Sequence, residues 1–235
     1  MKKFFRKIVI SIKRKLKFLL FPYILFLLKT KNYKNINELL DFILDTKGGV
    51  LIASQVREEI SGLLKIIEKQ KPKIILEIGT QEGGTLFLFS RLSSCDATII
   101  SIDLPKGNFG GGYSKWKIPL FKNFTYPKQK LFLIRKNSHN LETLEKIREI
   151  LKGKNIDFLF IDGDHSYNGV KSDFKMYSGL VNKGIIAFHD IVPGLARKVG
   201  GVPKFWKEIK NKYPSKEIVK DWQQGGRGIG ILEKK

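Results

Sequence analysis

The sequence predicts an α/β fold built on a doubly wound, mostly parallel sheet. Two apolar runs stop abruptly at acids and histidines, Phe-Ile-Asp-Gly-Asp-His at residues 160–165 and Ile-Ala-Phe-His-Asp at residues 186–190. A third run, at residues 74–78, enters a glycine-rich turn that opens a helix. Parallel strands end at a common sheet edge, so these three ends would place ionisable side chains beside a turn that a ligand can approach. That edge is the candidate functional site.

Length and charge suggest an extension at residues 1–50 followed by one domain at residues 51–235. The formal net charge is +22, and half of this excess lies in residues 1–37, which hold eleven Lys and Arg and no acid. The domain itself is therefore only moderately basic. A single cysteine, Cys95, excludes an internal disulfide and fits a reducing compartment, so we expect a cytoplasmic protein.

The first nineteen residues predict a basic amphipathic helix, because apolar residues recur at helical spacing and Lys or Arg fills most other positions. The apolar run 18–28 contains Pro22 and is well short of the roughly 20 residues that a membrane span needs. Lys29-Thr30-Lys31 follows it, so we expect no signal-peptide cleavage site. Three interpretations stay open: packing on the domain or on a second copy, peripheral binding to the inner face of an anionic membrane, and contact with nucleic acid, the least favoured.

Helices and strands alternate from residue 50 onward, which predicts parallel strands joined by crossover helices. The first helix covers residues 56–67 and ends before Lys71-Pro72. The expected elements after the strand at 74–78 are a helix at 84–92, strands at 98–102 and 130–134, a helix at 141–151, a strand at 156–161, a helix at 167–177, a strand at 184–188, a helix at 205–213, and a terminal antiparallel hairpin of 217–222 with 228–232. The long segment 104–129 is expected to form a lid or to be disordered.

Three motifs resemble those of a known enzyme family. These are Glu77-Ile78-Gly79-Thr80 with Gly83-Gly84-Thr85, the acid Asp103 after the second strand, and Ile161-Asp162-Gly163-Asp164-His165-Ser166-Tyr167. Together they resemble Rossmann-like class I S-adenosylmethionine-dependent methyltransferases, in particular the cephalosporin-hydroxylase-like and metal-dependent sugar O-methyltransferase subgroup. The resemblance covers residues 55–233. A nicotinamide-binding fold is the nearest competitor, but the second glycine of its G-x-G-x-x-G motif is absent.

The resemblance implies a set of cofactor contacts. Residues Glu77, Gly79, Thr80 and Gly83 would hold the methionyl end of S-adenosylmethionine, with Asp162 beside them. Asp103 would accept hydrogen bonds from the ribose hydroxyls, as acids after the second strand do in dinucleotide-binding folds. Asn137 and Ser138, after the third strand, are weaker candidates for the adenine edge. The alternative is that Glu77 and Asp103 only cap the turns that follow them.

The same resemblance implies a divalent metal held by Asp162, His189 and Asp190. His189 stands where an acid is usual, and imidazole suits manganese, iron or zinc better than magnesium. His165 matches a proposed general base, and imidazole titrates near neutrality. A buried, hydrogen-bonded structural role remains open for both histidines. Asp164 is expected to be the N-cap of the helix that begins near Ser166.

The first functional hypothesis is therefore an S-adenosylmethionine-dependent, metal-assisted O-methyltransferase that acts on a hydroxyl of a sugar, glycolipid or related metabolite. A second is an RNA-binding protein or RNA methyltransferase recruited by the basic N-terminus, although no base-flipping motif follows the fourth strand. A third is a non-catalytic, membrane-associated domain, suggested by His189 in the metal position. A homo-oligomer is compatible with all three.

Overall fold

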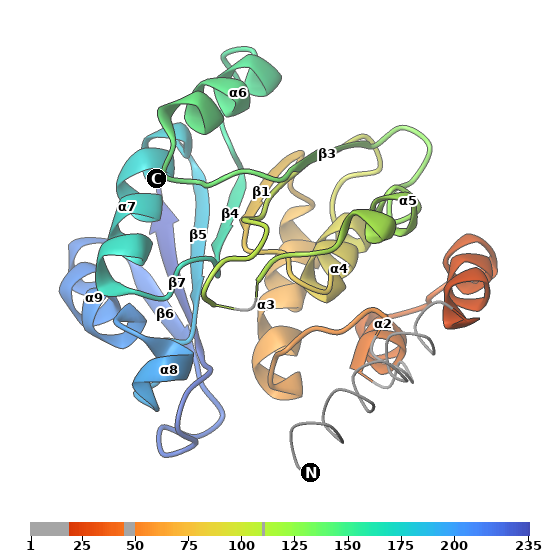
Figure 1. The fold of residues 1–235 in the computed structure, drawn as a ribbon. Helices are drawn as coiled ribbons and strands as arrows, with labels where there is room; N and C mark the ends of the chain where they lie inside the picture. The colour runs from red at the N-terminus through yellow and green to blue at the C-terminus, as the bar shows by residue number, and fades with distance from the viewer. Residues whose placement is uncertain (1–18, 45–49, 110) are drawn as a thin grey trace, which may run out of the picture.

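The computed structural model describes residues 19–44, 50–109 and 111–235. Within these ranges a seven-stranded sheet has the order β3-β2-β1-β4-β5-β7-β6 (Figure 1). The strands are β1 (Ile74–Ile78), β2 (Thr98–Ile102), β3 (Lys130–Ile134), β4 (Phe158–Ile161), β5 (Gly184–His189), β6 (Ser215–Ile218) and β7 (Ile229–Lys234). β1 to β5 are parallel, while β7 is antiparallel to both β5 and β6. The predicted fold class and the terminal hairpin are confirmed.

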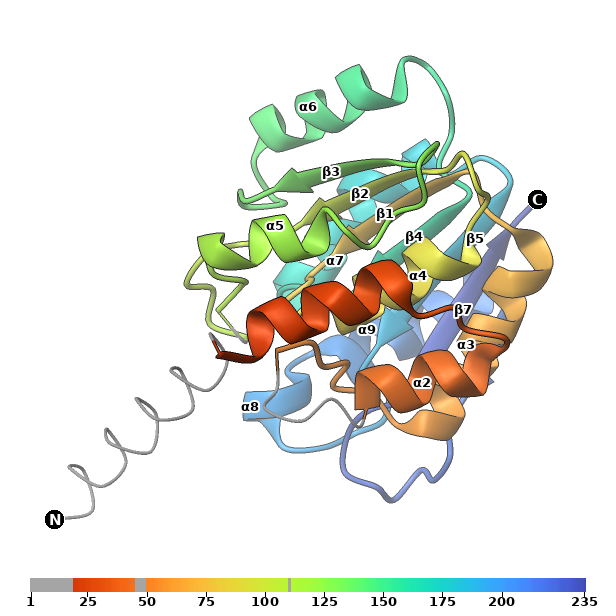
Figure 2. The same cartoon turned by 90° about the vertical axis from the view of Figure 1, so that its right-hand side faces the viewer.

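Helices cover both faces of the sheet, as Figures 1 and 2 show. The helices are α2 (Ile36–Leu44), α3 (Arg57–Gln70), α4 (Gly84–Leu92), α5 (Ile118–Phe121), α6 (Leu141–Leu151), α7 (Tyr167–Tyr177), α8 (Ala196–Val199) and α9 (Val202–Ile209), and residues 19–30 are also helical. Three short 3-10 turns lie at Lys115–Lys117, Ser178–Leu180 and Lys210–Lys212. α2, α3, α4 and α5 contribute to one hydrophobic cluster, and α6, α7 and α9 to the other.

The central strands are buried along their whole length. Every residue of β1 and β4 is buried, as expected for parallel strands covered on both faces. On the α4 side, the ring of Phe89 makes edge contacts with Phe158 and Phe160 at centroid distances of 5.1 and 5.2 Å. On the α9 side, Trp206 packs on Phe188 at 5.7 Å. The two layers hold the strand ends, and therefore the site, in a fixed arrangement.

Residues 19–44 pack onto this core. Ile24 and Leu28 of the helix at 19–30, and Leu40 and Ile43 of α2, are buried in the same cluster as Phe87 of α4. The opposite face of the helix at 19–30 leaves apolar side chains in solvent, since Leu19, Tyr23 and Phe26 are 76%, 57% and 59% exposed. In the described ranges, no helix has the length and apolar character to cross a membrane. The basic helix predicted for the first nineteen residues lies almost entirely outside the described residues.

The segment at 104–129 differs from the expected lid or disordered loop. It contains the 3-10 turn at Lys115–Lys117 and α5, and its side chains Leu120, Phe121 and Phe124 are fully buried. Three aromatic residues of this segment, Tyr113, Phe121 and Phe124, therefore belong to the core. The residues of the segment that border the cavity described below are Leu104, Gly107, Asn108, Phe109, Gly111 and Gly112. Two helices, α2 and α8, have no counterpart among the elements predicted from the sequence. Element ends also shift: β4 starts at Phe158, and the last helix starts at Val202 because Pro203 suits a first helical turn.

Candidate functional site

The carboxyl ends of β1, β2, β4 and β5 border one cavity of about 480 Å³. Ligands bind at this edge in doubly wound sheets, next to the point where the strand order reverses, here between β1 and β4. The site residues expected from the sequence that line this cavity are Gly79, Asp103, Ser138, Asp162, His165, His189 and Asp190. Glu77, Thr80 and Gly83 lie behind its wall.

Gly79 lies where the end of β1 presses against the end of β4. Its φ is +92°, and a Cβ at this position would lie 2.0 Å from the carbonyl oxygen of Asp162. Backbone packing therefore requires glycine here, independently of any ligand. Gly83 has a φ of +87°, and its Cβ would lie 2.4 Å from the ring of Phe121. Gly83 thus serves the packing of α5 behind the turn.

Glu77 is a buried carboxyl group beneath the turn. Its Oε2 accepts a hydrogen bond from the Thr80 hydroxyl at 2.7 Å, and that hydroxyl also lies 2.6 Å from the Ser101 hydroxyl. Burial raises the pKa of Glu77 to about 8, although the hydrogen bonds from Thr85 and Thr80 oppose this. The group shapes the turn from behind and does not itself line the cavity.

Asp103, at the end of β2, faces the cavity and organises two loops. Its Oδ2 accepts hydrogen bonds from the backbone N–H groups of Gln81 and Tyr113, both at 3.0 Å. Burial raises the pKa of Asp103 to about 6 against these hydrogen bonds. One carboxylate therefore ties the glycine turn to the loop after β2, at the position where the resemblance implies a ribose contact.

Side chains of α7 hold the part of the cavity wall that follows β3. Tyr177 donates its hydroxyl hydrogen to the carbonyl oxygen of Ser138 at 2.6 Å. The neighbouring His139 lies 3.2 Å from the buried carboxylate of Asp173, whose hydrogen bond raises the pKa of His139. Asn137 and Ser138 both border the cavity, so the structure places these weaker candidates on the same wall as Asp103.

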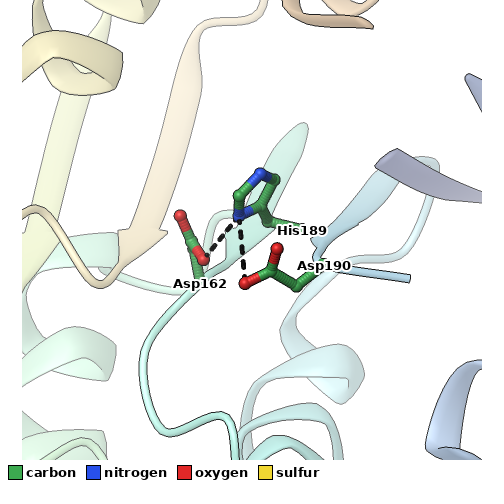
Figure 3. Close-up of side chains that lie close together, drawn as sticks. All are labelled: Asp162, His189 and Asp190. Carbon is green, nitrogen blue, oxygen red and sulfur yellow. Dashed lines mark hydrogen bonds and ion pairs between the residues drawn. The ribbon is translucent and has the colours of Figure 1, made fainter. Parts of the chain in front are cut away.

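Two carboxylates and an imidazole converge at the ends of β4 and β5 (Figure 3). Nδ1 of His189 lies 3.0 Å from Oδ1 of Asp162 and 3.7 Å from Oδ2 of Asp190. One ligand atom from each of the three residues lies within 4.8 Å of the others. Nε2 of His189 is buried and has no hydrogen-bond partner in the described chain. The three residues expected to hold a metal therefore lie close enough together to share one ion, and that role stays a prediction.

His165 joins this cluster from the segment after β4. Its Nδ1 lies 2.6 Å from the carbonyl oxygen of Lys198, which can only accept a hydrogen bond, so Nδ1 carries the hydrogen. Its Nε2 lies 3.2 Å from Oδ1 of Asp162. The ring stacks on Phe109 with a centroid distance of 5.0 Å and an interplanar angle of 22°. Nε2 is thus the ring nitrogen that faces Asp162.

The charged groups in this cluster shift one another's pKa values. Burial would raise the pKa of Asp162, but His189 and His165 outweigh it, and the pKa of Asp162 falls well below its ordinary range. Burial would lower the pKa of His165, but the hydrogen bond and charge of Asp162 outweigh it and raise that pKa to about 9. The pKa of His189 is raised against burial by the charge of Asp162. Asp162 is therefore the charge on which the raised pKa values of both histidines depend.

Asp190 is held in an unusual backbone conformation. Its φ is +62°, which is rare for a residue with a side chain. Its Oδ1 accepts a hydrogen bond from the backbone N–H of Arg227 at 2.8 Å. The buried carboxylate of Glu59 on α3 fixes the loop that carries Arg227, since it accepts hydrogen bonds from the backbone of Lys220 and Gly228 at 3.0 and 2.8 Å.

Several cavity residues carry no motif in the sequence. Phe109, Arg197 and Arg227 come from three separate segments, and only folding brings them to this edge.

The N-cap prediction for Asp164 was wrong. Ser166 is the N-cap of α7, because its hydroxyl accepts a hydrogen bond from the Gly169 N–H at 3.0 Å, while Asp164 accepts one from the Ser166 N–H. Either residue type suits an N-cap, and Ser166, two residues further along the chain, occupies that position.

Comparison with known proteins gives a family-level match. Residues 76–191 match a protein-family model described as a methyltransferase domain. An uncharacterized protein of Acanthamoeba polyphaga mimivirus is 36% identical over 126 residues, which cover 49% of this chain and 50% of that protein. The chain spans half or less of the length of the curated relatives it matches.

Solved structures with similar folds include two O-methyltransferases. The enzyme from Bacillus cereus, determined in complex with SAH, has a TM-score of 0.59 and 18% sequence identity, and the match covers 89% of this chain and 96% of that one. TomG from Streptomyces achromogenes, involved in tomaymycin synthesis and determined in complex with SAM, has a TM-score of 0.57 and 16% identity, covering 87% and 92%. At these identities the likeness establishes the fold.

We expect Glu77→Gln to remove a pH dependence of stability. Between the ordinary pKa of 4.5 and about 8, the unfolded chain has released a proton that the folded chain retains on Glu77. Stability is therefore greatest below the lower value and falls as pH rises through this window, by up to about 1.4 kcal/mol per pH unit.

Urea denaturation across this pH range measures the effect, with Glu145→Gln on the exposed face of α6 as the control for loss of one carboxylate. The difference in unfolding free energy between wild type and Glu77→Gln should change with pH. A constant difference would show that Glu77 does not hold its proton in the folded protein.

Proposed function

We propose that this chain is an S-adenosylmethionine-dependent O-methyltransferase, because residues 76–191 match a methyltransferase-domain model and the fold is similar to that of solved O-methyltransferases. The observation that carries the proposal is the cavity itself. The wall formed by Gly79, Asp103 and Ser138 meets the cluster of Asp162 and His165 in a single space at the carboxyl edge of the sheet. A cofactor wall and a proton-accepting group are therefore within reach of the same molecule.

The residues present suit the cofactor. S-adenosylmethionine supplies a methyl group on a sulfonium, whose departure leaves a neutral thioether. Asp103 offers a buried carboxylate to the ribose hydroxyls, and Asn137 and Ser138 offer polar groups to the adenine edge. Gly79 and Gln81 form the turn beside the methionyl end, while Glu77, Thr80 and Gly83 support that turn from behind.

Asp162, His189 and Asp190 suit a divalent cation, since their ligand atoms already converge. A cation there would lower the pKa of an acceptor hydroxyl and, by offsetting the charge of Asp162, that of His165. One imidazole among the ligands favours manganese, iron or zinc over magnesium.

His165 is the proposed general base. The Lys198 carbonyl holds the hydrogen on Nδ1, so Nε2 takes the proton of the acceptor hydroxyl as its oxygen bonds to the methyl carbon and the carbon–sulfur bond breaks. The products are a methyl ether and S-adenosylhomocysteine. By resemblance to the sugar O-methyltransferases, the acceptor is a hydroxyl of a sugar, glycolipid or related metabolite.

Cofactor binding is tested by titration calorimetry with S-adenosylmethionine and S-adenosylhomocysteine. Asp103→Ala should weaken binding by roughly 10- to 100-fold, because the ribose loses its acceptor and two backbone N–H groups lose theirs. Asp96→Ala is the matched control, since Asp96 is an exposed acid just before the opposite end of β2. Absence of binding by folded wild-type protein would reject the methyltransferase proposal.

Mutations should separate the proposed metal-binding role of Asp190 from the proposed base role of His165. Asp190→Asn should weaken manganese binding and leave S-adenosylhomocysteine binding intact, because Asp190 belongs to the metal cluster. His165→Ala should retain both ligands but lose about 10²- to 10⁴-fold in methyl-transfer rate, the usual contribution of a positioned base. An unchanged rate would reduce His165 to a structural role, and full activity in excess chelator would reject the metal.

The N-terminal segment 1–28 is proposed to contact an anionic membrane surface. Leu19, Tyr23 and Phe26 recur at helical spacing on the exposed side of their helix. The adjoining sequence is basic throughout, with no acid before residue 38. Anionic membrane surfaces bind segments that combine exposed apolar side chains with a cluster of positive charges.

Flotation with anionic and neutral vesicles tests this contact. Replacing Leu19, Tyr23 and Phe26 with Ser should abolish flotation with anionic vesicles and preserve folding, because these side chains are in solvent. Leu141→Ser, at a 71% exposed position of α6, is the control. Undiminished flotation of the triple variant would show that these three side chains do not make the membrane contact. Loss of a dimer in the variant would instead assign this face to contact with a second copy of the chain.

A further inference from the structure

The cavity is basic at the end that faces the proposed acceptor. Four Lys and Arg residues line it: Lys136, Arg197, Lys198 and Arg227. Lys136, beside the cofactor wall, forms an ion pair with Glu142 at 2.5 Å. Within the described ranges, the other three make no ion pair with a carboxylate, and the Arg227 guanidinium contacts only the backbone carbonyl of Ser54. Three positive charges at one end of the cavity therefore have no neutralising partner.

These cations belong to segments that are fastened to the reaction centre. α8, which carries Arg197 and Lys198, is held by the 2.6 Å hydrogen bond from His165 to the Lys198 carbonyl. The loop between β6 and β7 is held by the 2.8 Å hydrogen bond from the Arg227 N–H to Asp190. Figures 1 and 2 show both segments at the same edge of the sheet. The backbones of Lys198 and Arg227 thus lie beside His165 and Asp190, and their side chains belong to residues that line the same cavity.

The acids of the cavity are engaged elsewhere. Asp162 and Asp190 both contact the two imidazoles, and Asp103 accepts from the backbone at the far wall. Asp164 accepts from the Ser166 N–H, and its charge acts on His139. A cavity with unpaired charge of one sign concentrates its field on an incoming ligand of the opposite sign. The acceptor end is consequently complementary to an anion.

We propose that the acceptor is a hydroxyl compound that carries a phosphate or carboxylate group, such as a sugar phosphate or a uronic acid. This rests on the proposed methyl transfer and narrows its substrate. Arg197, Lys198 and Arg227 bind the anionic group, and the guanidinium groups can do so through paired hydrogen bonds. Binding of this anionic group would hold one hydroxyl of the acceptor beside Nε2 of His165. The binding energy would thereby align that hydroxyl for methyl transfer.

The experiment compares matched acceptors in the presence of saturating S-adenosylhomocysteine. Glucose, glucuronate and glucose 6-phosphate are titrated by ligand-observed NMR against wild type, the double variant Arg197→Ala/Lys198→Ala, and the control Lys207→Ala/Lys212→Ala. The control removes two positive charges from exposed positions that do not line this cavity. Wild type and control should bind at least one anionic sugar about tenfold or more tightly than glucose, and the Arg197→Ala/Lys198→Ala variant should lose that preference.

Three outcomes would overturn the inference: equal binding of glucose and its anionic derivatives, no binding of either anion at millimolar concentration, or equal losses in both double variants. Binding of glucuronate alone or glucose 6-phosphate alone identifies the anionic group. S-adenosylhomocysteine binding is measured first on every variant. Its absence in wild type counts against the methyltransferase proposal, whereas its presence without anion selectivity counts only against the anionic acceptor.

Discussion

The site depends on the close approach of the backbones at the ends of β1 and β4. Gly79 donates its N–H to the Ile102 carbonyl at 2.9 Å, and Asp162 donates its N–H to the Ile78 carbonyl at 2.8 Å. The missing side chain of Gly79 leaves room for the Asp162 carbonyl. This contact sets where the glycine turn, and with it Asp103, lies relative to Asp162. A side chain at residue 79 would separate the proposed cofactor wall from Asp162.

From this contact, three of the remaining groups are positioned by hydrogen bonds to backbone atoms. Asp103 holds two loops, Asp190 holds the N–H of Arg227, and the Lys198 carbonyl holds His165. Each partner belongs to a different segment of the chain. The reaction centre is therefore rigid only when the whole carboxyl edge is assembled, which suits a reaction that gains most from alignment.

The sequence predicts the strands and the motif residues well because both signals are local. The strands at 98–102 and 130–134 match the observed β2 and β3, and Asp162, His189 and Asp190 meet as expected for acids and histidines after adjacent parallel strands. Long-range packing leaves no comparable signal in the local sequence. The burial of Phe121 and Phe124, which turned an expected lid into core, depends on Phe87 of α4 and residues of α2. The cations of α8 and of the β6–β7 loop likewise reach the cavity only through tertiary contacts.

Asp190 combines a side chain at the reaction centre with a backbone angle that glycine would adopt more easily. Residues in such conformations cost about 1–3 kcal/mol each and persist where the surroundings impose them. Glycine would relieve this backbone cost but would lose the hydrogen bond from the Arg227 N–H, whereas Asn would keep that bond. A search for stabilising substitutions that places Gly or Asn here would therefore remove the carboxylate of a proposed metal ligand.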